Sequence, residues 1–200
     1  HPLDPMSPYA AAKCGADRLV SSYVKTYDIP AVILRPFNNY GPRQHLEKVV
    51  PRFITSSLLG EPLTVHGEGQ AARDFVHVYD TCRAIDKVMH GNSVQLRGKT
   101  FNIASGTDRS IRSIAEDIAA RMNVEPEQIV FTGDRPGQVI RHTGDACRIK
   151  EELGWVPEIS WDQGLDQTID WFTNQPDWWS KQLWMRHIPI RSKSGEIEMH

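Results

Sequence analysis

Residues 7–34 read SPYAAAKCGADRLVSSYVKTYDIPAVIL, and this stretch predicts a long helix followed at once by a buried strand. Ser7 is a good helix N-cap, and Pro8 suits the first helical position. Asp28 and Pro30 end the helix, and the apolar, partly β-branched run at 31–34 is typical of a buried strand. Apolar side chains at steps of three and four predict one buried helix face: Ala12, Ala16, Leu19, Tyr23 and Tyr27.

The alternation of helices and strands continues along the rest of the chain. Further strands are expected at 63–65, 74–78, 100–104 and 129–131, and further helices at 47–59, 80–89, 111–122, 146–153 and 161–172. Their expected N-caps, where the sequence offers one, are Asp80, Ser110, Asp145 and Ser160. Residues 174–200 are Trp-rich and are expected to be irregular. The alternation predicts an α/β protein.

Composition excludes several classes of protein. The chain has 200 residues, a formal net charge of −2 and 40% hydrophobic residues, which argues against disorder and against a general nucleic-acid or polybasic membrane binder. No apolar run is long enough to span a membrane. The three cysteines form no C-x-x-C pair and the eight histidines form no H-E-x-x-H motif, so no disulfide framework and no metal site are expected. A reducing, cytoplasmic compartment fits best.

The start of the chain predicts that it is a piece of a longer protein. It opens on His1 and Pro2 rather than on Met. No G-x-G-x-x-G motif follows a strand, so the piece has no phosphate loop of its own for a dinucleotide. We expect the piece by itself to be inactive.

Tyr9 and Lys13 form a Y-x-x-x-K pair near the start of the first helix. Their i, i+4 spacing puts both side chains on one helix face. A nearby ammonium group favours phenolate over phenol, so such a pair can supply a tyrosine base. Taken alone, the pair is better explained as a surface aromatic–lysine contact.

Several motifs follow the Y-x-x-x-K pair in a fixed order. They are RPFNNYGPR at 35–43, EKVVP at 47–51, PLTVHGEGQ at 62–70, RDFVHV at 73–78 with Asp80, RPG at 135–137 with Arg141, and ELGW at 152–155. Together with SPYAAAK at 7–13, this set resembles the extended short-chain dehydrogenase/reductase family. Within that family it is most similar to the NAD-dependent nucleotide-sugar epimerases and dehydratases, especially the dTDP-glucose 4,6-dehydratases. The resemblance runs from Pro2 to about Phe172.

The resemblance implies a fold and a division into domains. The fold would be the C-terminal part of a Rossmann-type doubly wound domain plus a smaller α/β substrate-binding domain. Residues 1–45 would belong to the NAD-binding domain. Residues 46–173 would form mainly the nucleotide-sugar-binding domain, with some segments returning to the Rossmann sheet, and 174–200 would be a tail. The full-length protein is expected to be a homodimer.

The resemblance also implies an activity. A nucleotide-diphosphate sugar would be oxidised at C4 by NAD, water would be eliminated, and hydride would return to C6. The alternatives are a nucleotide-sugar 4-epimerase, a UDP-glucuronate decarboxylase, or a non-catalytic nucleotide-sugar-binding module. The Asp-Glu pair that marks the dehydratases, and the Ser/Thr that completes the catalytic set, would precede His1.

At the cofactor end of the implied site, Tyr9 would be the base at the sugar 4-hydroxyl and Lys13 would hold the nicotinamide ribose. Pro36 and Phe37 would lie beside the nicotinamide, and Asn38 would bind the substrate diphosphate.

At the nucleotide end, three consecutive residues would line the pocket, two would flank the base, and two arginines would clamp the diphosphate. These are Glu47, Lys48 and Val49, then Val65 and His66, then Arg73 and Arg141. Relatives often have Tyr where this chain has His66, which departs from the family pattern.

Overall fold

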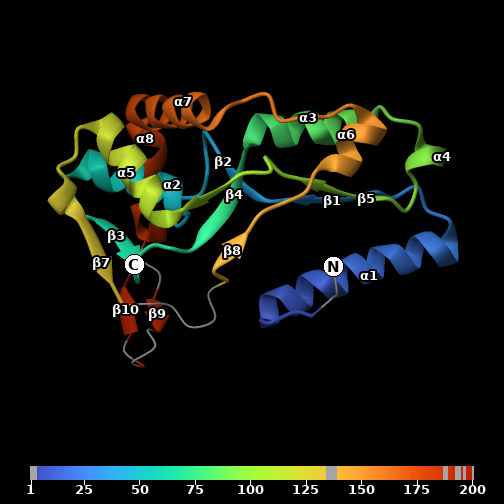
Figure 1. Ribbon diagram of the computed structural model, residues 1–200, viewed down its shortest axis with the longest axis horizontal. Helices are drawn as coiled ribbons and strands as arrows, with labels where there is room; N and C mark the ends of the chain where they lie inside the picture. The colour runs from blue at the N-terminus through green and yellow to red at the C-terminus, as the bar shows by residue number, and fades with distance from the viewer. Residues whose placement is uncertain (1–3, 134–138, 187–188, 192–194, 196, 200) are drawn as a thin grey trace.

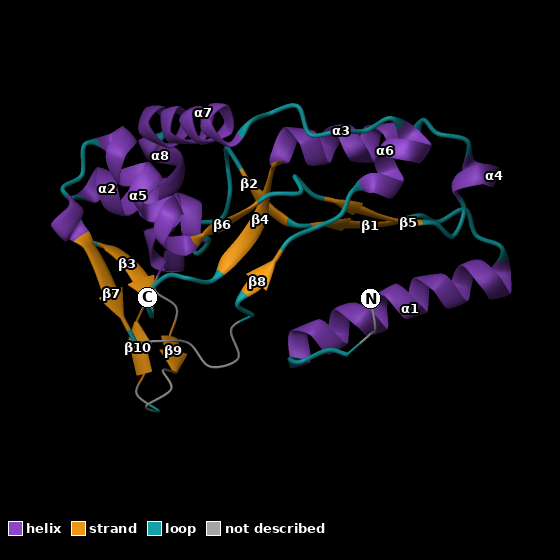
Figure 2. Ribbon diagram, viewed as in Figure 1, coloured by secondary structure: helices purple, strands orange, loops and turns teal. Residues whose placement is uncertain are grey.

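The structure is a computed structural model that describes residues 4–133, 139–186, 189–191, 195 and 197–199. The helices are α1 (Pro8–Tyr27), α2 (Val49–Leu59), α3 (Val78–Met89), α4 (Ser93–Leu96), α5 (Ile111–Met122), α6 (Cys147–Leu153), α7 (Trp161–Asn174) and α8 (Pro176–Trp179), with short 3-10 helices η1 (Pro126–Gln128) and η2 (Ser180–Arg186). The strands are β1 (Ile33–Pro36), β2 (Asn38–Tyr40), β3 (Leu63–His66), β4 (Ala72–His77), β5 (Thr100–Ile103), β6 (Asp108–Ser110), β7 (Ile129–Thr132), β8 (Arg141–His142), β9 (Pro189–Arg191) and β10 (Ile197–Met199). The predicted α/β class is confirmed (Figure 2).

Helix α1 begins and ends as predicted. The Ser7 hydroxyl accepts a hydrogen bond from the Ala10 amide, Pro8 starts the helix, and Asp28 ends it in the left-handed conformation. The predicted buried face is wrong for this chain, because no residue of α1 is buried and Leu19 is 60% exposed. Figure 1 shows the reason: α1 runs apart from the other helices, and no element of the described chain covers its outer face.

One part of the fold is built on the parallel pair of β1 and β5, in which Ile33 lies opposite Thr100. Helices α3 and α6 lie on one side of this pair (Figure 1). Its hydrophobic core includes Phe101, Ile149 and Trp155, all fully buried. The Trp155 indole donates to the Asp80 carbonyl at 3.0 Å, so the tryptophan ties its loop to α3.

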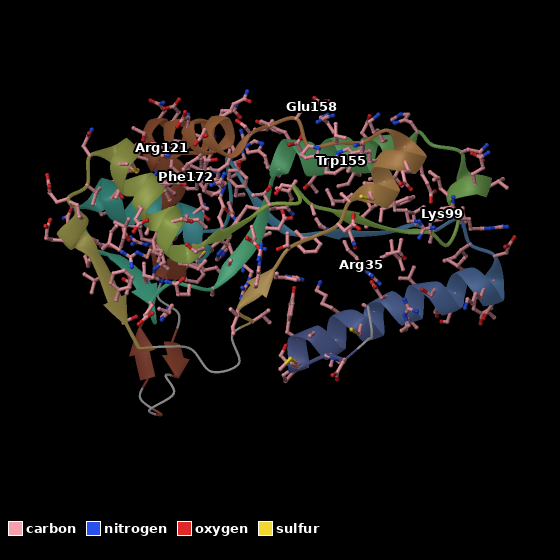
Figure 3. All side chains as sticks on the ribbon, viewed as in Figure 1. Arg35, Lys99, Arg121, Trp155, Glu158 and Phe172 are labelled. Atoms are coloured by element: carbon pink, nitrogen blue, oxygen red, sulfur yellow. The ribbon has the colours of Figure 1, made fainter. Side chains whose placement is uncertain are left out.

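The other part combines two small sheets with α2, α5 and α7. Strand β4 lies between β2 and β6, with β8 also paired to it, and β3 pairs in parallel with β7. The core here includes Phe53, Ile114, Leu165 and Phe172, all buried. Figure 3 labels Phe172 and Trp155, one from each core, with Phe172 to the left of Trp155.

Strand β4 connects the two cores because its side chains alternate between the two faces of the sheet. Phe75 packs in the core with Phe172, whereas Val76 packs in the core with Trp155. The buried Asp74 carboxylate accepts hydrogen bonds from the amides of Ser105, Gly106 and Gly144. It therefore fixes two loops beside β4. The proposed boundary of the NAD-binding domain at residue 45 stays a prediction.

Two predicted helix caps are wrong. Helix α3 is capped by His77, whose ring accepts from the Tyr79 amide, while Asp80 lies inside the first turn and holds the amides of Glu158 and Ile159. Asp145 precedes the cap position of α6, although its carboxylate accepts from the Cys147 amide at 2.8 Å. In both places the aspartate does not occupy the cap position, but its carboxylate still accepts hydrogen bonds from backbone amides.

The segment after residue 174 is more regular than expected. It continues into α8, η2 and the antiparallel pair of β9 and β10. Trp179 is 5% exposed, and its indole donates to the Phe172 carbonyl at 2.7 Å. The side chains of Trp178, Trp179 and Leu183 pack against the body of the protein, whereas Trp184 is 70% exposed. Within the described residues, no helix has the length and apolar character needed to cross a membrane.

Candidate functional site

Most of the residues expected in the site line one cavity of about 850 Å³. The described wall includes these expected residues: Tyr9, Phe37, Asn38, Glu47, Lys48, Val49, His66 and Arg73. They come from the first turn of α1, the β1–β2 connection, the start of α2, the end of β3 and the start of β4. Separate motifs of the sequence therefore meet at one place.

Local geometry explains how the cavity wall is held. The Asn38 amide donates to the Asp74 carbonyl at 2.9 Å, in line with the register that pairs Asn38 with Phe75. Lys48 is the N-cap residue of α2. The side chains of Glu47 and Lys48, at the N-terminal end of this helix, line the cavity. The wall is built on strand ends and helix starts, which hold the side chains more firmly than loops do.

The cavity has an excess of positive charge. Lys48, Arg52 and Arg73 line it, and Glu47 is the one carboxylate in its described wall. Lys48 binds Glu47 at 2.6 Å, and this hydrogen bond is the main cause that lowers the pKa of the Glu47 carboxyl. In the described wall, the three basic side chains of Lys48, Arg52 and Arg73 therefore outnumber the one carboxylate.

Arg73 is partly buried in the cavity wall. Its Nη1 donates to the Ala72 carbonyl at 2.7 Å, and within the described chain it forms no ion pair with a carboxylate. Burial lowers the pKa of the Arg73 guanidinium, but an arginine stays protonated at neutral pH. The side chain therefore presents to the cavity a cation that has no carboxylate partner among the described residues.

Tyr9 and Lys13 share one face of α1, as their spacing predicts. The Lys13 Nζ lies 5.7 Å from the centre of the Tyr9 ring. Tyr9 lines the cavity and is 73% exposed, whereas Lys13 is outside the described wall. The Tyr9 phenol is therefore open to a ligand in the cavity, and the Lys13 ammonium group lies beside it on the same helix.

Some expected residues lie elsewhere. Val65 is fully buried in the hydrophobic core, because alternate residues of β3 face opposite sides and its neighbours Thr64 and His66 take the cavity side. Pro36 is the exposed last residue of β1 and is not part of the described wall. The motif at 135–137 lies entirely within 134–138, outside the described residues.

The expected convergence of Arg73 and Arg141 is wrong for this structure. Strand β8 pairs with β4 so that Arg141 lies opposite Ala72 and His142 lies opposite Arg73. Paired residues of neighbouring strands share a face, so the Arg141 side chain faces away from the cavity. It forms an ion pair with Asp108 there, which holds the pKa of that carboxyl below its usual range.

The structure adds residues that sequence reasoning missed. Arg52 follows Lys48 by four positions and so faces the same side of α2, and Thr64 precedes His66 by two positions in β3. Both were available from helix and strand periodicity. His142 could not be found this way, because its ring packs on Phe37, 4.8 Å between centroids, only through the β4–β8 pairing.

Most of the chain is similar to known proteins. A family model described as GDP-mannose 4,6 dehydratase matches residues 1–168. The low-salt glycan biosynthesis protein Agl12 of Haloferax volcanii is 42% identical over 171 residues, covering 86% of this chain and 54% of that protein. The dTDP-glucose 4,6-dehydratase of Xanthomonas campestris pv. campestris is 37% identical over 186 residues, covering 88% of this chain and 52% of that enzyme.

A solved structure shares the fold. DesIV, a dTDP-glucose 4,6-dehydratase from Streptomyces venezuelae with NAD and TYD bound, matches with a TM-score of 0.85 at 35% identity. The match covers 90% of this chain and 55% of that one. The chain spans about half the length of the relatives it matches.

Proposed function

The chain belongs to the GDP-mannose 4,6-dehydratase family, and we propose that the full-length protein is an NAD-dependent nucleotide-sugar 4,6-dehydratase. The observation that carries this proposal is the single cavity that joins Tyr9 to Lys48, Arg52 and Arg73. It combines a phenol suited to proton transfer with cationic groups suited to a diphosphate. Relatives named dTDP-glucose 4,6-dehydratase support the choice of reaction.

The residues present fit the nicotinamide end of NAD. Tyr9 and Lys13 lie on one helix face, and Phe37 supplies an aromatic wall beside Tyr9 in the cavity. When bound, NAD would withdraw two electrons from C4 of the sugar and return them at C6 after water has left. Lys13 would donate hydrogen bonds to the nicotinamide ribose, and Phe37 would shield the ring from water.

The chain's own residues would then position the substrate and move one proton. Tyr9 would accept the proton of the sugar 4-hydroxyl, and Asn38 would bind the diphosphate. Arg73 would neutralise the diphosphate with its planar set of donors. His66 and Thr64 lie together on β3, at the end of the cavity where the base of the nucleotide would lie.

An assay of the full-length protein tests this proposal. We would incubate it with dTDP-glucose, UDP-glucose, GDP-mannose and UDP-glucuronate in turn and identify the products by mass spectrometry and NMR. Loss of water with formation of a 4-keto-6-deoxy sugar supports the dehydratase. Inversion at C4 alone would indicate an epimerase, CO₂ release from UDP-glucuronate would indicate a decarboxylase, and binding without turnover would indicate a binding module.

We also propose that the full-length protein is a cytoplasmic homodimer. The free cysteines Cys14, Cys82 and Cys147 support a reducing compartment, since two of them are exposed. The exposed Leu19, Tyr23 and Tyr27 on α1 support a further packing partner for this helix. Sedimentation of the full-length protein measures the oligomeric state directly.

A further inference from the structure

The Phe37 ring in the cavity wall is backed by a chain segment that lies outside the described wall. Phe37 lines the cavity, whereas His142 and Gly144 do not. The His142 ring packs against the Phe37 ring, with 4.8 Å between the centroids and 39° between the planes. The Phe37 ring therefore lies between the cavity and residues 142–144.

Gly144 leaves no space for a side chain beside this ring. A Cβ atom at position 144 would lie 2.7 Å from Cε2 and 2.8 Å from Cζ of Phe37, and 2.3 Å from Cβ of Ala104. Carbon atoms that are not bonded to each other normally stay about 3.5–4.0 Å apart. Gly144 is not one of the glycines with a positive φ angle, so space rather than backbone conformation requires a glycine here.

Two carboxylates anchor the backbone around Gly144. The fully buried Asp74 carboxylate accepts a hydrogen bond from the Gly144 amide at 3.1 Å. The neighbouring Thr143 hydroxyl donates to the Asp108 carboxylate. Since these bonds resist a retreat of the segment, a side chain at position 144 would move the Phe37 ring instead. The ring lies at the end of a side chain that can rotate, and the free space beside it is the cavity.

We propose that Gly144 is a positioning residue that sets how far the Phe37 ring projects into the cavity, and so how much room is left for the sugar of a nucleotide sugar. The proposal rests on the function proposed above, in which Phe37 and Tyr9 line the sugar end of the cavity. A methyl group at position 144 would push the ring toward the sugar. The nucleoside diphosphate would keep its contacts, because Lys48 and Arg73 reach the cavity from α2 and β4.

Calorimetry on the full-length protein with NAD bound tests this proposal, with UDP, dTDP and GDP compared with UDP-glucose, dTDP-glucose and GDP-mannose. Every protein in the series carries Tyr9→Phe, which slows turnover of the sugar during the titration. Gly144→Ala is expected to raise the Kd of the nucleotide sugar about tenfold and the Kd of the nucleoside diphosphate less than about twofold. Phe37→Ala/Gly144→Ala should bind the nucleotide sugar no more weakly than Phe37→Ala, because no ring remains to be displaced.

A methyl exchange keeps the test valid if Gly144→Ala does not fold. Ala104→Gly/Gly144→Ala removes the closest carbon atom and keeps the contact with Phe37, so it should show the same selective loss. Ala104→Gly alone is the control and should keep both affinities. An unchanged Kd for the nucleotide sugar in the folded variants overturns the proposal. Equal losses for the nucleotide sugar and the nucleoside diphosphate, or additive losses in Phe37→Ala/Gly144→Ala, also overturn it. Failure of the wild-type protein to bind any nucleotide instead overturns the proposed function.

Discussion

Arg73 and Arg141 lie on paired strands and point to opposite faces of the sheet. Arg73 lines the cavity, and Arg141 forms an ion pair with Asp108 on the other face. The two arginines therefore form a natural comparison, since they are close in space and differ in the direction of the side chain.

Arg73→Ala in the full-length protein is expected to weaken nucleoside diphosphate binding by about tenfold or more, because charge-assisted hydrogen bonds contribute about 1.5–3 kcal/mol each. Arg141→Ala should weaken it by less than about twofold. Calorimetry with UDP or dTDP measures both. Arg73→Lys should recover part of the affinity, since lysine keeps the charge and loses the planar fork. Equal losses for both alanine variants would contradict the assignment of faces.

Val65 and His66 are consecutive residues with opposite surroundings, one in the core and one at the cavity. Val65→Ala is expected to lower the free energy of unfolding by about 1–3 kcal/mol, and His66→Ala by less than about 1 kcal/mol. Urea unfolding measures the difference. Nucleotide affinity should show the reverse order, and a larger loss of affinity for Val65→Ala in the folded protein would contradict the strand register.

His77 predicts a pH dependence of stability. The residue is 1% exposed, and burial lowers the pKa of its imidazole. Below a pH of about 6.5 the unfolded chain binds a proton that the folded chain resists, so this contribution to stability is lost as the pH falls. The groups packed around the ring include Tyr40, Tyr79 and Asp80; of these, the Asp80 carboxylate opposes the effect of burial.

The measurement is urea unfolding between pH 7.5 and 5, compared for the wild type and His77→Gln. The slope of stability against pH should be smaller in the variant. His90→Gln, at the exposed C-cap of the same helix, is the matched control and should leave the slope unchanged. An identical slope for wild type and His77→Gln would show that His77 is not the group responsible.

The 200-residue chain alone is expected to bind NAD weakly. A dinucleotide pyrophosphate normally rests on a glycine turn at a helix N-terminus, and no G-x-G-x-x-G follows a strand in this sequence. Calorimetric titration of this chain and of the full-length protein compares the two. A micromolar Kd for the 200-residue chain would contradict the expectation.

The sequence was sufficient for the longer helices and for strands β1, β3, β4, β5 and β7, but it did not predict β2, β6 or β8. Caps such as Ser7, Ser110 and Ser160 are local signals, and the structure places all three as predicted. Only the resemblance to a known family predicted that the distant motifs meet at one site. The misplacement of Arg141 could not be avoided from sequence, because the face of a two-residue strand depends on its register with β4.

The exposed face of α1 shows a different limit. Helical periodicity identified its apolar side chains correctly, but it carries no information about which part of a protein covers them. The hydrogen bond from Arg186 to Ser56 of α2 could not be predicted either, because these positions are separated by 130 residues and the tail has no recognisable motif.

The central claim is that the cavity holding Tyr9 is a catalytic site, and Tyr9→Phe in the full-length protein tests it most directly. The change removes the proton acceptor and keeps the ring, so turnover of the nucleotide sugar should fall by about 10²–10⁴-fold with nearly unchanged affinity. Tyr23→Phe, on the same helix and outside the described cavity wall, is the matched control and should keep normal turnover. Near-normal turnover in Tyr9→Phe, measured as sugar product formed per enzyme, would contradict the account.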